Sequence, residues 1–318
     1  MSSLIEQAAE RLAQLRRAGA VLPDAKPAQR LPGGGQPAVA PRPATLLAEP
    51  AATSRYVELD FDTLAAGGLL TPTAPRSLLG DQYRVLKRPL IRNAFGKGAD
   101  QLSHGNLIMV TSALAGEGKS FTSVNLAMSI ATELDHTVML VDADVARPSV
   151  SRMLGLVSAS EPNFGPGLLD VLDGSADMSD VLVRTNIDKL TVLPSGTQHA
   201  RATELLASEA MSRLLNEMAK RYPDRIIIFD SPPLLLTTEA RVLASHMGQI
   251  IVIVHAGTTL QSDVQAALAT IESCPVRMVV LNQASVTREG GYGYGYGYGY
   301  GHGREALTEA STLEAPTS

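Results

Sequence analysis

Six runs of apolar residues, separated by polar or glycine-rich segments, set the strongest limit on how this chain can fold. Within each run the hydrophobic residues are largely continuous and do not alternate with polar ones. Such runs are typical of strands in a parallel sheet that is buried on both faces. We predict strands at Asn106–Ser112, Thr137–Ala143, Lys189–Pro194, Arg225–Ser231, Gln249–Ala256 and Arg277–Gln283.

Helical segments lie between several of these strands, among them Ser120–Leu134, Thr203–Arg221 and Leu260–Ser273. Strands that alternate with helices in this way favour an α/β domain with a doubly wound, mostly parallel sheet. In such sheets ligands bind at the carboxyl ends of the strands. We therefore look for chemistry where the predicted strands end.

A glycine-rich turn, "ALAGEGKS", follows the first predicted strand. It matches the P-loop pattern G-x-x-x-x-G-K-[ST], except that Ala113 occupies the first glycine position. Gly116 and Gly118 permit a tight turn in which backbone N–H groups and the start of a helix face phosphate oxygens. Lys119 is placed to reach the β- and γ-phosphates, and Ser120 to ligate Mg²⁺. The turn therefore predicts a nucleotide site.

Acidic residues follow two of the predicted strands. Asp142 and Asp144 are two residues apart in "MLVDAD", so they share a face if the strand is regular. Asp230 follows four apolar residues in "IIIFDSPP" and has the form of a Walker B aspartate, which holds Mg²⁺ directly or through water. A solvated acidic loop is the alternative for the first two. With the P-loop, these carboxylates predict a magnesium phosphate site.

The predicted nucleotide and metal contacts gather around these motifs. Asn282, at the end of the last predicted strand, could read a base edge or could cap a loop. The predicted nucleotide-binding residues are Gly116, Glu117, Gly118, Lys119, Ser120, Phe121 and Asn282, and the predicted metal ligands are Ser120, Asp142 and Asp230.

Glycine and tyrosine alternate near the carboxyl end, in "EGGYGYGYGYGYGHGRE". Five of the eight tyrosines of the chain lie there: Tyr292, Tyr294, Tyr296, Tyr298 and Tyr300. Glycine at alternate positions disfavours both helix and strand, which predicts a disordered tail. From Thr287 to Tyr300 the chain can extend roughly 43–47 Å, with a root-mean-square span of about 20 Å. The tyrosines would therefore be accessible to anything that acts on them.

The chain divides by composition into four parts. A capping box and a stripe of apolar residues predict a helix over residues 1–20, and a proline-, alanine- and glycine-rich linker follows over 21–75. The α/β domain occupies 76–287 and the tyrosine-rich tail 288–318. Pro89 is expected to kink or end the helix that opens the domain.

Composition excludes several classes of function. A formal net charge of −5 disfavours a nucleic-acid partner. A single cysteine, Cys274, excludes an internal disulfide framework and suits a reducing cytoplasm. No signal peptide is evident, and no stretch approaches the roughly 18 apolar residues that span a bilayer.

The motifs "SALAGEGKS", "LVDADVARPS" and "IIIFDSPP", followed by a tyrosine-rich tail, resemble those of bacterial tyrosine kinases of the P-loop type. More narrowly, the chain is similar to the tyrosine autokinases that accompany exosortase and exopolysaccharide gene sets. The resemblance extends over most of the chain. Each motif alone is shared with P-loop ATPases related to MinD and ParA.

The resemblance implies a role for each site residue. Lys119 and Ser120 would hold ATP and Mg²⁺. Asp142 would assist metal binding and take the proton of the acceptor tyrosine, Asp144 would help place the tyrosine hydroxyl, and Asp230 would complete the metal shell. The acceptors would be the five tail tyrosines, phosphorylated by a neighbouring subunit in a ring.

The resemblance also implies partners. In the family a helix with the pattern E-x-x-R-x-x-R packs into the neighbouring subunit; here the matching residues are Asp81, Arg84 and Lys87. Many members carry an arginine where this chain has Ala146, which leaves the role of Arg147 open. A separate membrane polysaccharide co-polymerase would activate a cytoplasmic kinase and recruit it to the inner face of the membrane. A phosphotyrosine phosphatase would reverse the reaction, and exopolysaccharide chain length, polymerisation or export would be regulated.

Two other classes of function are consistent with a P-loop. A MinD- or ParA-like positioning switch carries a signature lysine at the start of the loop, where this chain has Leu114. A catalytically weak scaffold would use ATP only to assemble. None of the sequence signatures of the eukaryotic type of protein kinase is present.

Overall fold

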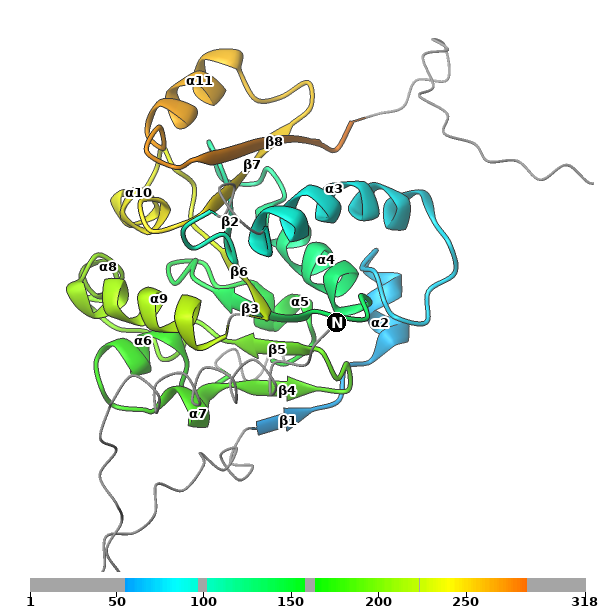
Figure 1. The fold of residues 1–318 in the computed structure, drawn as a ribbon, viewed down its shortest axis with the longest axis horizontal. Coiled ribbons are helices and arrows are strands. Elements are labelled where there is room, and N and C mark those ends of the chain that lie inside the picture. Colours follow the sequence, from blue (N-terminus) through cyan, green and yellow to red (C-terminus); the bar gives the residue numbers. More distant parts are fainter. Residues whose placement is uncertain (1–54, 97–101, 158–163, 223, 285–318) are drawn as a thin grey trace, which may run out of the picture. The chain divides into compact units, whose positions relative to one another are not determined.

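The computed structural model describes residues 55–96, 102–157, 164–222 and 224–284 (Figure 1). The predicted amino-terminal helix and the tyrosine-rich tail lie outside the described residues. Within the described parts, no helix combines the length and the apolar character needed to cross a membrane.

Eight strands form one sheet in the order β1-β4-β5-β3-β6-β2-β7-β8, and every described pairing is parallel except that of β4 with β5. The strands are β1 (Arg55–Val57), β2 (Leu107–Ser112), β3 (Thr137–Asp142), β4 (Val183–Thr185), β5 (Leu190–Leu193), β6 (Arg225–Asp230), β7 (Gln249–His255) and β8 (Val276–Asn282). The predicted doubly wound, mostly parallel sheet is confirmed.

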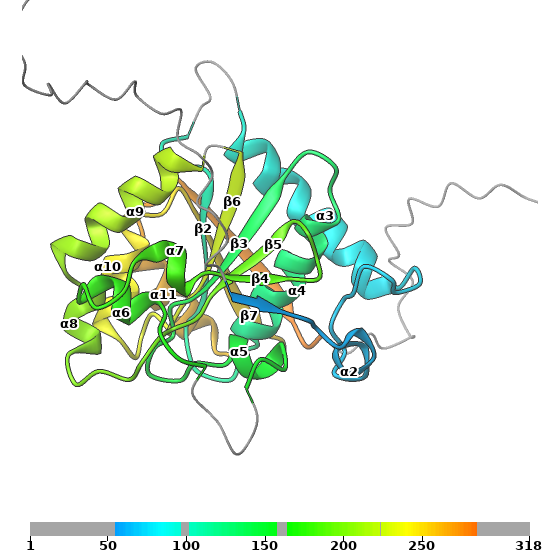
Figure 2. The same ribbon diagram turned by 90° about the horizontal axis from the view of Figure 1, so that it is seen from below.

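Helices cover both faces of the sheet (Figure 2). One face carries α2 (Phe61–Ala66), α3 (Leu78–Ala94), α4 (Lys119–Ala131) and α5 (Val150–Met153). The other carries α6 (Leu168–Leu172), α7 (Met178–Val181), α8 (Ala202–Leu206), α9 (Glu209–Arg221), α10 (Thr238–Ala244) and α11 (Gln261–Ala269).

The two layers explain the continuous apolar runs. Along β2, Leu107 and Met109 pack in the core beneath α9 and α10, while Ile108 and Val110 pack beneath α3 and α4. Because successive side chains of a strand point to opposite faces, a strand covered on both faces needs apolar residues at every position. All six predicted strands are present.

Strand β8 departs from this pattern. It lies at the edge of the sheet, and its side chains alternate between half-buried and exposed. Val279 is 52% exposed and Leu281 is 63% exposed. The expectation of burial on both faces is therefore wrong for this strand, because its pattern of apolar residues does not distinguish an edge from the centre of a sheet.

The predicted linker over 21–75 extends too far. From Arg55 the chain forms β1 and α2, and Leu59, Leu64 and Leu69 are buried against the helical layer of α3 and α4. The Asn186 side chain fixes this segment, since it accepts from the backbone N–H of Leu59 at 3.0 Å and donates to the Leu59 carbonyl at 3.0 Å. A three-residue strand and a six-residue helix are too short to stand out by periodicity.

Two helix boundaries also differ from expectation. Pro89 does not end helix α3, which continues to Ala94. The carbonyl that loses its N–H partner there belongs to Val85, four residues earlier, which is 73% exposed, so water can replace the missing donor. The predicted helix Thr203–Arg221 is divided into α8 and α9, because Ser208 caps the backbone N–H of Met211 at 3.3 Å.

The three residues predicted to face a neighbouring subunit lie in two different environments. Asp81 and Arg84 form an ion pair with each other on the exposed surface of α3. Lys87 is buried at 4% exposure, and its Nζ lies 2.7 Å from Glu133 Oε1 and donates to the Ser129 carbonyl. The family pattern implies that all three residues contact a neighbouring subunit, but Lys87 instead binds the carboxyl end of α4 within its own domain, where a cation is favourable.

We expect Lys87→Met to lower the free energy of unfolding by about 1–3 kcal/mol, because it keeps the buried stem and removes the charge that neutralises the end of α4. Urea denaturation measures the change. Arg221→Met is the matched control, since Arg221 forms an exposed pair with Glu217, and its loss should cost no more than about 0.5 kcal/mol. Equal effects of the two substitutions would contradict a structural role for Lys87.

Candidate active site

The loop between β2 and α4 is held in a conformation that requires glycine. Gly116 has φ +84° and Gly118 has φ +93°, both in the left-handed region. A Cβ on Gly118 would also lie 2.1 Å from Asn282 Nδ2. Gly118 caps α4, so the N–H groups of the first turn of this helix are free to face an anion.

Side chains from distant elements brace this loop. The Glu117 carboxylate is 3% exposed, accepts from the Leu114 N–H at 2.6 Å and accepts from the Thr259 hydroxyl. Asn282 donates from Nδ2 to the Glu117 carbonyl at 2.9 Å. The Glu117 side chain thus links the loop between β2 and α4 to the loop after β7. In this structure Asn282 acts as a loop brace, and its contact with a base remains a prediction.

Asp142 and Asp230 lie opposite each other at the ends of β3 and β6, as paired residues of the parallel ladder, and both are completely buried. Asp142 Oδ2 accepts from the N–H groups of Ser149 and Val150 at 3.1 and 3.0 Å. Asp230 Oδ1 accepts from the Ser123 hydroxyl at 3.0 Å. Each carboxylate is therefore oriented through one oxygen.

The second oxygen of each carboxylate, Asp142 Oδ1 and Asp230 Oδ2, is buried without a hydrogen-bond partner. Burial raises the pKa of Asp142 well above its usual value, and the charge of Asp230 raises it further. Burial also raises the pKa of Asp230 to about 6. Two unpaired oxygens on neighbouring buried carboxylates are what a cation would satisfy.

The donor set fits Mg²⁺ better than a metal that needs a full protein cage. Among the described residues, no group of three or more His, Cys, Asp or Glu side chains could enclose a metal ion. Mg²⁺ is commonly held by one or two carboxylates, with phosphates and waters completing an octahedron. The Ser120 hydroxyl accepts from the Ser149 hydroxyl at 2.7 Å beside these carboxylates.

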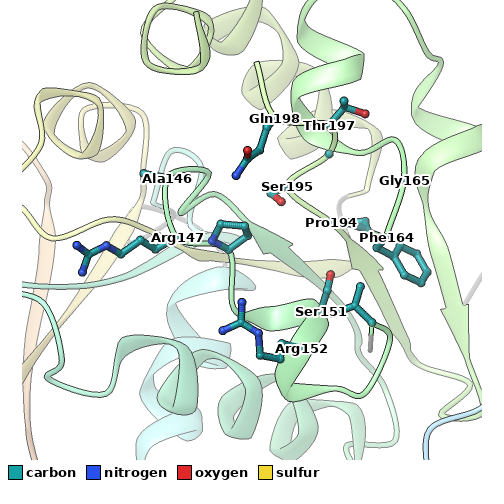
Figure 3. A pocket seen from close by; sticks show the side chains of 13 residues that line it. Ala146, Arg147, Ser151, Arg152, Phe164, Gly165, Pro194, Ser195, Thr197 and Gln198 are labelled. Carbon is teal, nitrogen blue, oxygen red and sulfur yellow. The ribbon is translucent and has the colours of Figure 1, made fainter. Parts of the chain in front are cut away.

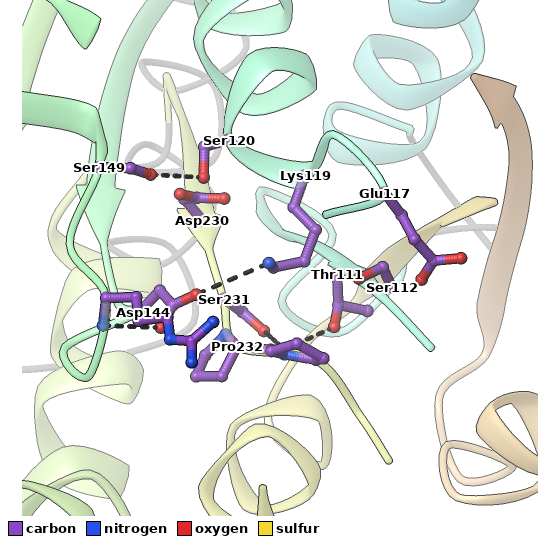
Figure 4. A network of polar contacts seen from close by, with 12 residues as sticks. Thr111, Ser112, Glu117, Lys119, Ser120, Asp144, Ser149, Asp230, Ser231 and Pro232 are labelled. Atoms are coloured by element: carbon purple, nitrogen blue, oxygen red, sulfur yellow. Dashed lines mark hydrogen bonds and ion pairs between the residues drawn. The ribbon is translucent and has the colours of Figure 1, made fainter. Parts of the chain in front are cut away.

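Lys119 and Asp144 face each other across the site (Figure 4). Lys119 Nζ lies 3.6 Å from Asp144 Oδ2, and both side chains are 9% exposed. Burial raises the pKa of Asp144, and the charge of Lys119 opposes that rise. Strand β3 ends at Asp142, so Asp144 reaches Lys119 from the following loop and not from the strand itself.

A cavity of about 320 Å³ opens over this group, which we call the phosphate cavity. Lys119, Ser120 and Asp144 line one side, and Arg147 also borders it. The opposite wall is Pro232, Pro233 and Leu236, and the Thr111 hydroxyl fixes it by donating to the Pro232 carbonyl at 2.8 Å. Phe121 instead packs against the core beneath α3 and α4, so its contact with a nucleotide remains a prediction.

Sequence motifs identified the charged groups of the site but missed their supports. Thr259, Val150 and Ser123 hold the loop and the carboxylates, yet they lie outside the matched motifs. Ser149 closes the motif "LVDADVARPS", but the sequence alone gave it no role. For Thr259 the sequence carried no signal, since it comes from the loop after β7.

The chain was compared with family models, with curated proteins and with solved structures. The family model described as an AAA domain matches residues 105–278. The chain is 36% identical to the tyrosine-protein kinase CpsD of Streptococcus pneumoniae over 191 residues, which cover 59% of this chain and 81% of that protein. It is 29% identical to the tyrosine-protein kinase YwqD of Bacillus subtilis over 226 residues, 70% of this chain and 89% of that protein. The kinase domain of the Escherichia coli tyrosine kinase ETK has the same fold, with a TM-score of 0.57 at 23% identity over 77% of this chain and 94% of that one.

We expect Asp230→Asn to stabilise the metal-free protein at about pH 7.5, by about 1–3 kcal/mol. The folded-state pKa lies above that of the unfolded chain, so the stability contributed by this group is present below about pH 4 and is lost as the pH rises through about 6. The amide removes the charge and keeps the acceptor for Ser123.

Urea unfolding in EDTA at about pH 7.5 and at about pH 4 measures this effect, and the gain should shrink at the lower pH. Asp188→Asn, at an exposed position, is the control and should change little at either pH. An Asp230→Asn protein that is less stable than wild type at the higher pH would show that burial of the charge is not costly here.

Proposed function

The chain belongs to the bacterial tyrosine-protein kinases, and we propose that it is an autokinase whose acceptors are the tail tyrosines of a neighbouring copy. The observation that carries the proposal is the pair of buried carboxylates with unpaired oxygens beside Lys119. The proposed acceptors are Tyr292, Tyr294, Tyr296, Tyr298 and Tyr300. Of the described tyrosines, Tyr83 is a poor acceptor, because it is 7% exposed and burial raises its pKa to about 12.

The residues of the site would bind the phosphates of ATP and Mg²⁺. Lys119 binds the β- and γ-phosphates of ATP, and the N–H groups at the start of α4 bind phosphate oxygens. Asp142 Oδ1 and Asp230 Oδ2, with the Ser120 hydroxyl, would hold Mg²⁺. When bound, Mg²⁺ neutralises charge on the β- and γ-phosphate oxygens.

Transfer forms a bond between the tyrosine oxygen and the γ-phosphorus and breaks the bond to the β-phosphate oxygen, which leaves with ADP. The tyrosine proton moves to a carboxylate of the site. The family resemblance assigns this proton to Asp142. Asp144, held by Lys119, would orient the tyrosine hydroxyl.

We further propose that the active unit is a homo-oligomer, as a ring, in which the exposed Asp81 and Arg84 of α3 contact the next subunit. From the family resemblance we also propose a separate membrane polysaccharide co-polymerase as activator and a phosphotyrosine phosphatase as a further partner. On the same ground we propose that the protein is recruited from the cytoplasm to the inner face of the membrane and controls exopolysaccharide synthesis. Membership of a kinase family favours this reading over a positioning ATPase or a scaffold.

Lys119→Met should lower autophosphorylation by at least about 10²–10³-fold, because it removes a cation that stabilises the transferring phosphoryl group. Label from radioactive ATP, located by mass spectrometry, measures the loss, and circular dichroism checks the fold. Lys220→Met, at an exposed position on α9, is the matched control and should keep its activity.

A mixing experiment tests transfer between copies. One partner is the Lys119→Met chain with an intact tail, and the other has an intact site and phenylalanine at the five tail positions. Neither should label strongly alone, whereas the mixture should place phosphate on the tail of the Lys119→Met chain. A mixture that stays unlabelled would restrict transfer to within one chain, and label mainly on Tyr56 or Tyr222 would remove the tail as substrate.

Arg84→Ala should weaken oligomers seen by light scattering, because it removes an exposed cation that we assign to the subunit contact. Lys87 is left intact in this experiment, since its burial would confuse a change in assembly with a loss of stability. An unchanged oligomer mass would mean that the Asp81–Arg84 pair is an ordinary solvated ion pair.

A further inference from the structure

A second, larger cavity adjoins the phosphate cavity (Figure 3). It measures about 600 Å³ and shares Ala146 and Arg147 with the phosphate cavity. One wall is the loop after β3 with the start of α5, which contributes Arg152, and the other is the segment after β5, Pro194–Gln198. We call it the side cavity.

The side cavity lies away from the part of the site predicted to take the nucleotide base. In the sheet order, β5 and β8 are on opposite sides of β2, which leads into the P-loop. The residue predicted to read the base, Asn282, is on β8. The side cavity at β5 is therefore on the side from which an acceptor would approach the phosphates.

The walls of the side cavity offer unpaired positive charge. Arg147 and Arg152 are exposed, and within the described parts of the chain neither guanidinium forms an ion pair. Asp170, near Gly196 of this wall, accepts through Oδ2 from the N–H groups of Gly167 and Thr197 at 2.7 and 2.9 Å and forms no ion pair with either arginine. An anion in the cavity would therefore meet free guanidinium groups.

The side chains of the two arginines point differently. In Figure 3 the Arg152 guanidinium extends from α5 towards the loop of Ser195 and Gln198, whereas Arg147 extends to the side. Arg147 also lines the phosphate cavity, and its backbone N–H donates to Asp144 Oδ1 at 3.3 Å. Val157 and Pro194 add apolar wall that a ring can contact, and the Arg55 guanidinium covers one face of the nearby Phe164 ring, 4.2 Å from its centroid. The cavity combines a cation and an apolar surface.

The repeat of the tail matches two adjoining cavities. In an extended chain, residues two apart point to the same side and are separated by about 6.6–6.8 Å. When one tail tyrosine enters the phosphate cavity, the next tyrosine of the repeat therefore faces the same surface. A phosphotyrosine carries about −1.5 to −2 charge at neutral pH and is a ligand that arginine binds through paired hydrogen bonds.

We propose that the side cavity is a phosphotyrosine subsite, in which Arg152 binds a tail tyrosine already phosphorylated, two residues from the acceptor. The proposal rests on the proposed function, since it assumes that tail tyrosines enter the phosphate cavity. Each phosphorylation then favours the next one along the same tail. The tail is modified in runs along the repeat and not at random positions.

Three peptides of residues 289–305 test this proposal. Each has Tyr296 as the one acceptor and phenylalanine at the other tyrosines, and two of them carry phosphotyrosine at position 294 or at position 298. The enzyme is the full chain with phenylalanine at its own five tail positions. Initial rates of labelling give KM for each peptide. We expect one phosphorylated peptide to have a KM about tenfold below that of the peptide without phosphate, and its identity gives the direction of the run.

Arg152→Ala should bring the KM of the favoured phosphorylated peptide close to the KM of the peptide without phosphate, so that their ratio is near one. Arg213→Ala, an exposed arginine of α9, is the matched control and should leave the ratio unchanged. Equal KM values for the three peptides with the enzyme that retains Arg152 would overturn the subsite. A difference in KM between these two peptides that persists in Arg152→Ala would overturn it as well. An equal rise of all three KM values in Arg152→Ala would overturn it too, because the arginine would then bind the peptide itself and not its phosphate group. Failure to label any peptide would instead contradict the proposed function itself.

Discussion

The parallel register of β3 with β6 is the constraint on which the site depends. It sets Asp142 opposite Asp230 in the interior, where two ionised carboxylates repel and neither is well solvated. The fold tolerates this because backbone N–H groups at α5 and the Ser123 hydroxyl each satisfy one oxygen. The remaining repulsion is local, and a bound cation would relieve it. The metal-free domain therefore gives up stability at the place where we propose that Mg²⁺ binds.

The P-loop is also held by contacts to the part of the sheet formed by β7 and β8. Glu117 and Asn282 tie it to the loop after β7 and to β8, while Lys119 ties its helix to the loop after β3. The two buried aspartates, the lysine and the loop are thus attached to five neighbouring strands, β3, β6, β2, β7 and β8.

The sequence predicted the central strands, the P-loop and the three aspartates because each depends on local pattern. Continuous apolar runs mark buried strands, and the spacing of glycine, lysine and serine marks a phosphate turn. What it missed depends on contacts between distant residues. The family pattern assigned Lys87 to a contact with a neighbouring subunit, whereas its position is explained by its contacts with the end of α4. The strands β1 and β4 are too short to carry a pattern, and Thr259 acts through a loop that no motif marks.

The contact of Asn282 with the P-loop has a consequence for the chain that follows β8. It anchors the root of the tail beside the nucleotide site of the same molecule. The group that would receive an acceptor, Lys119 with Asp144, lies between β2 and the loop after β3, which is two to four strand spacings from β8, about 10–19 Å. The eight residues from Ala284 to Tyr292 extend at most about 26–29 Å, so even the first tyrosine of the repeat could reach the site of its own molecule. Under the proposed function, transfer within one chain would therefore compete with transfer between chains for the same site.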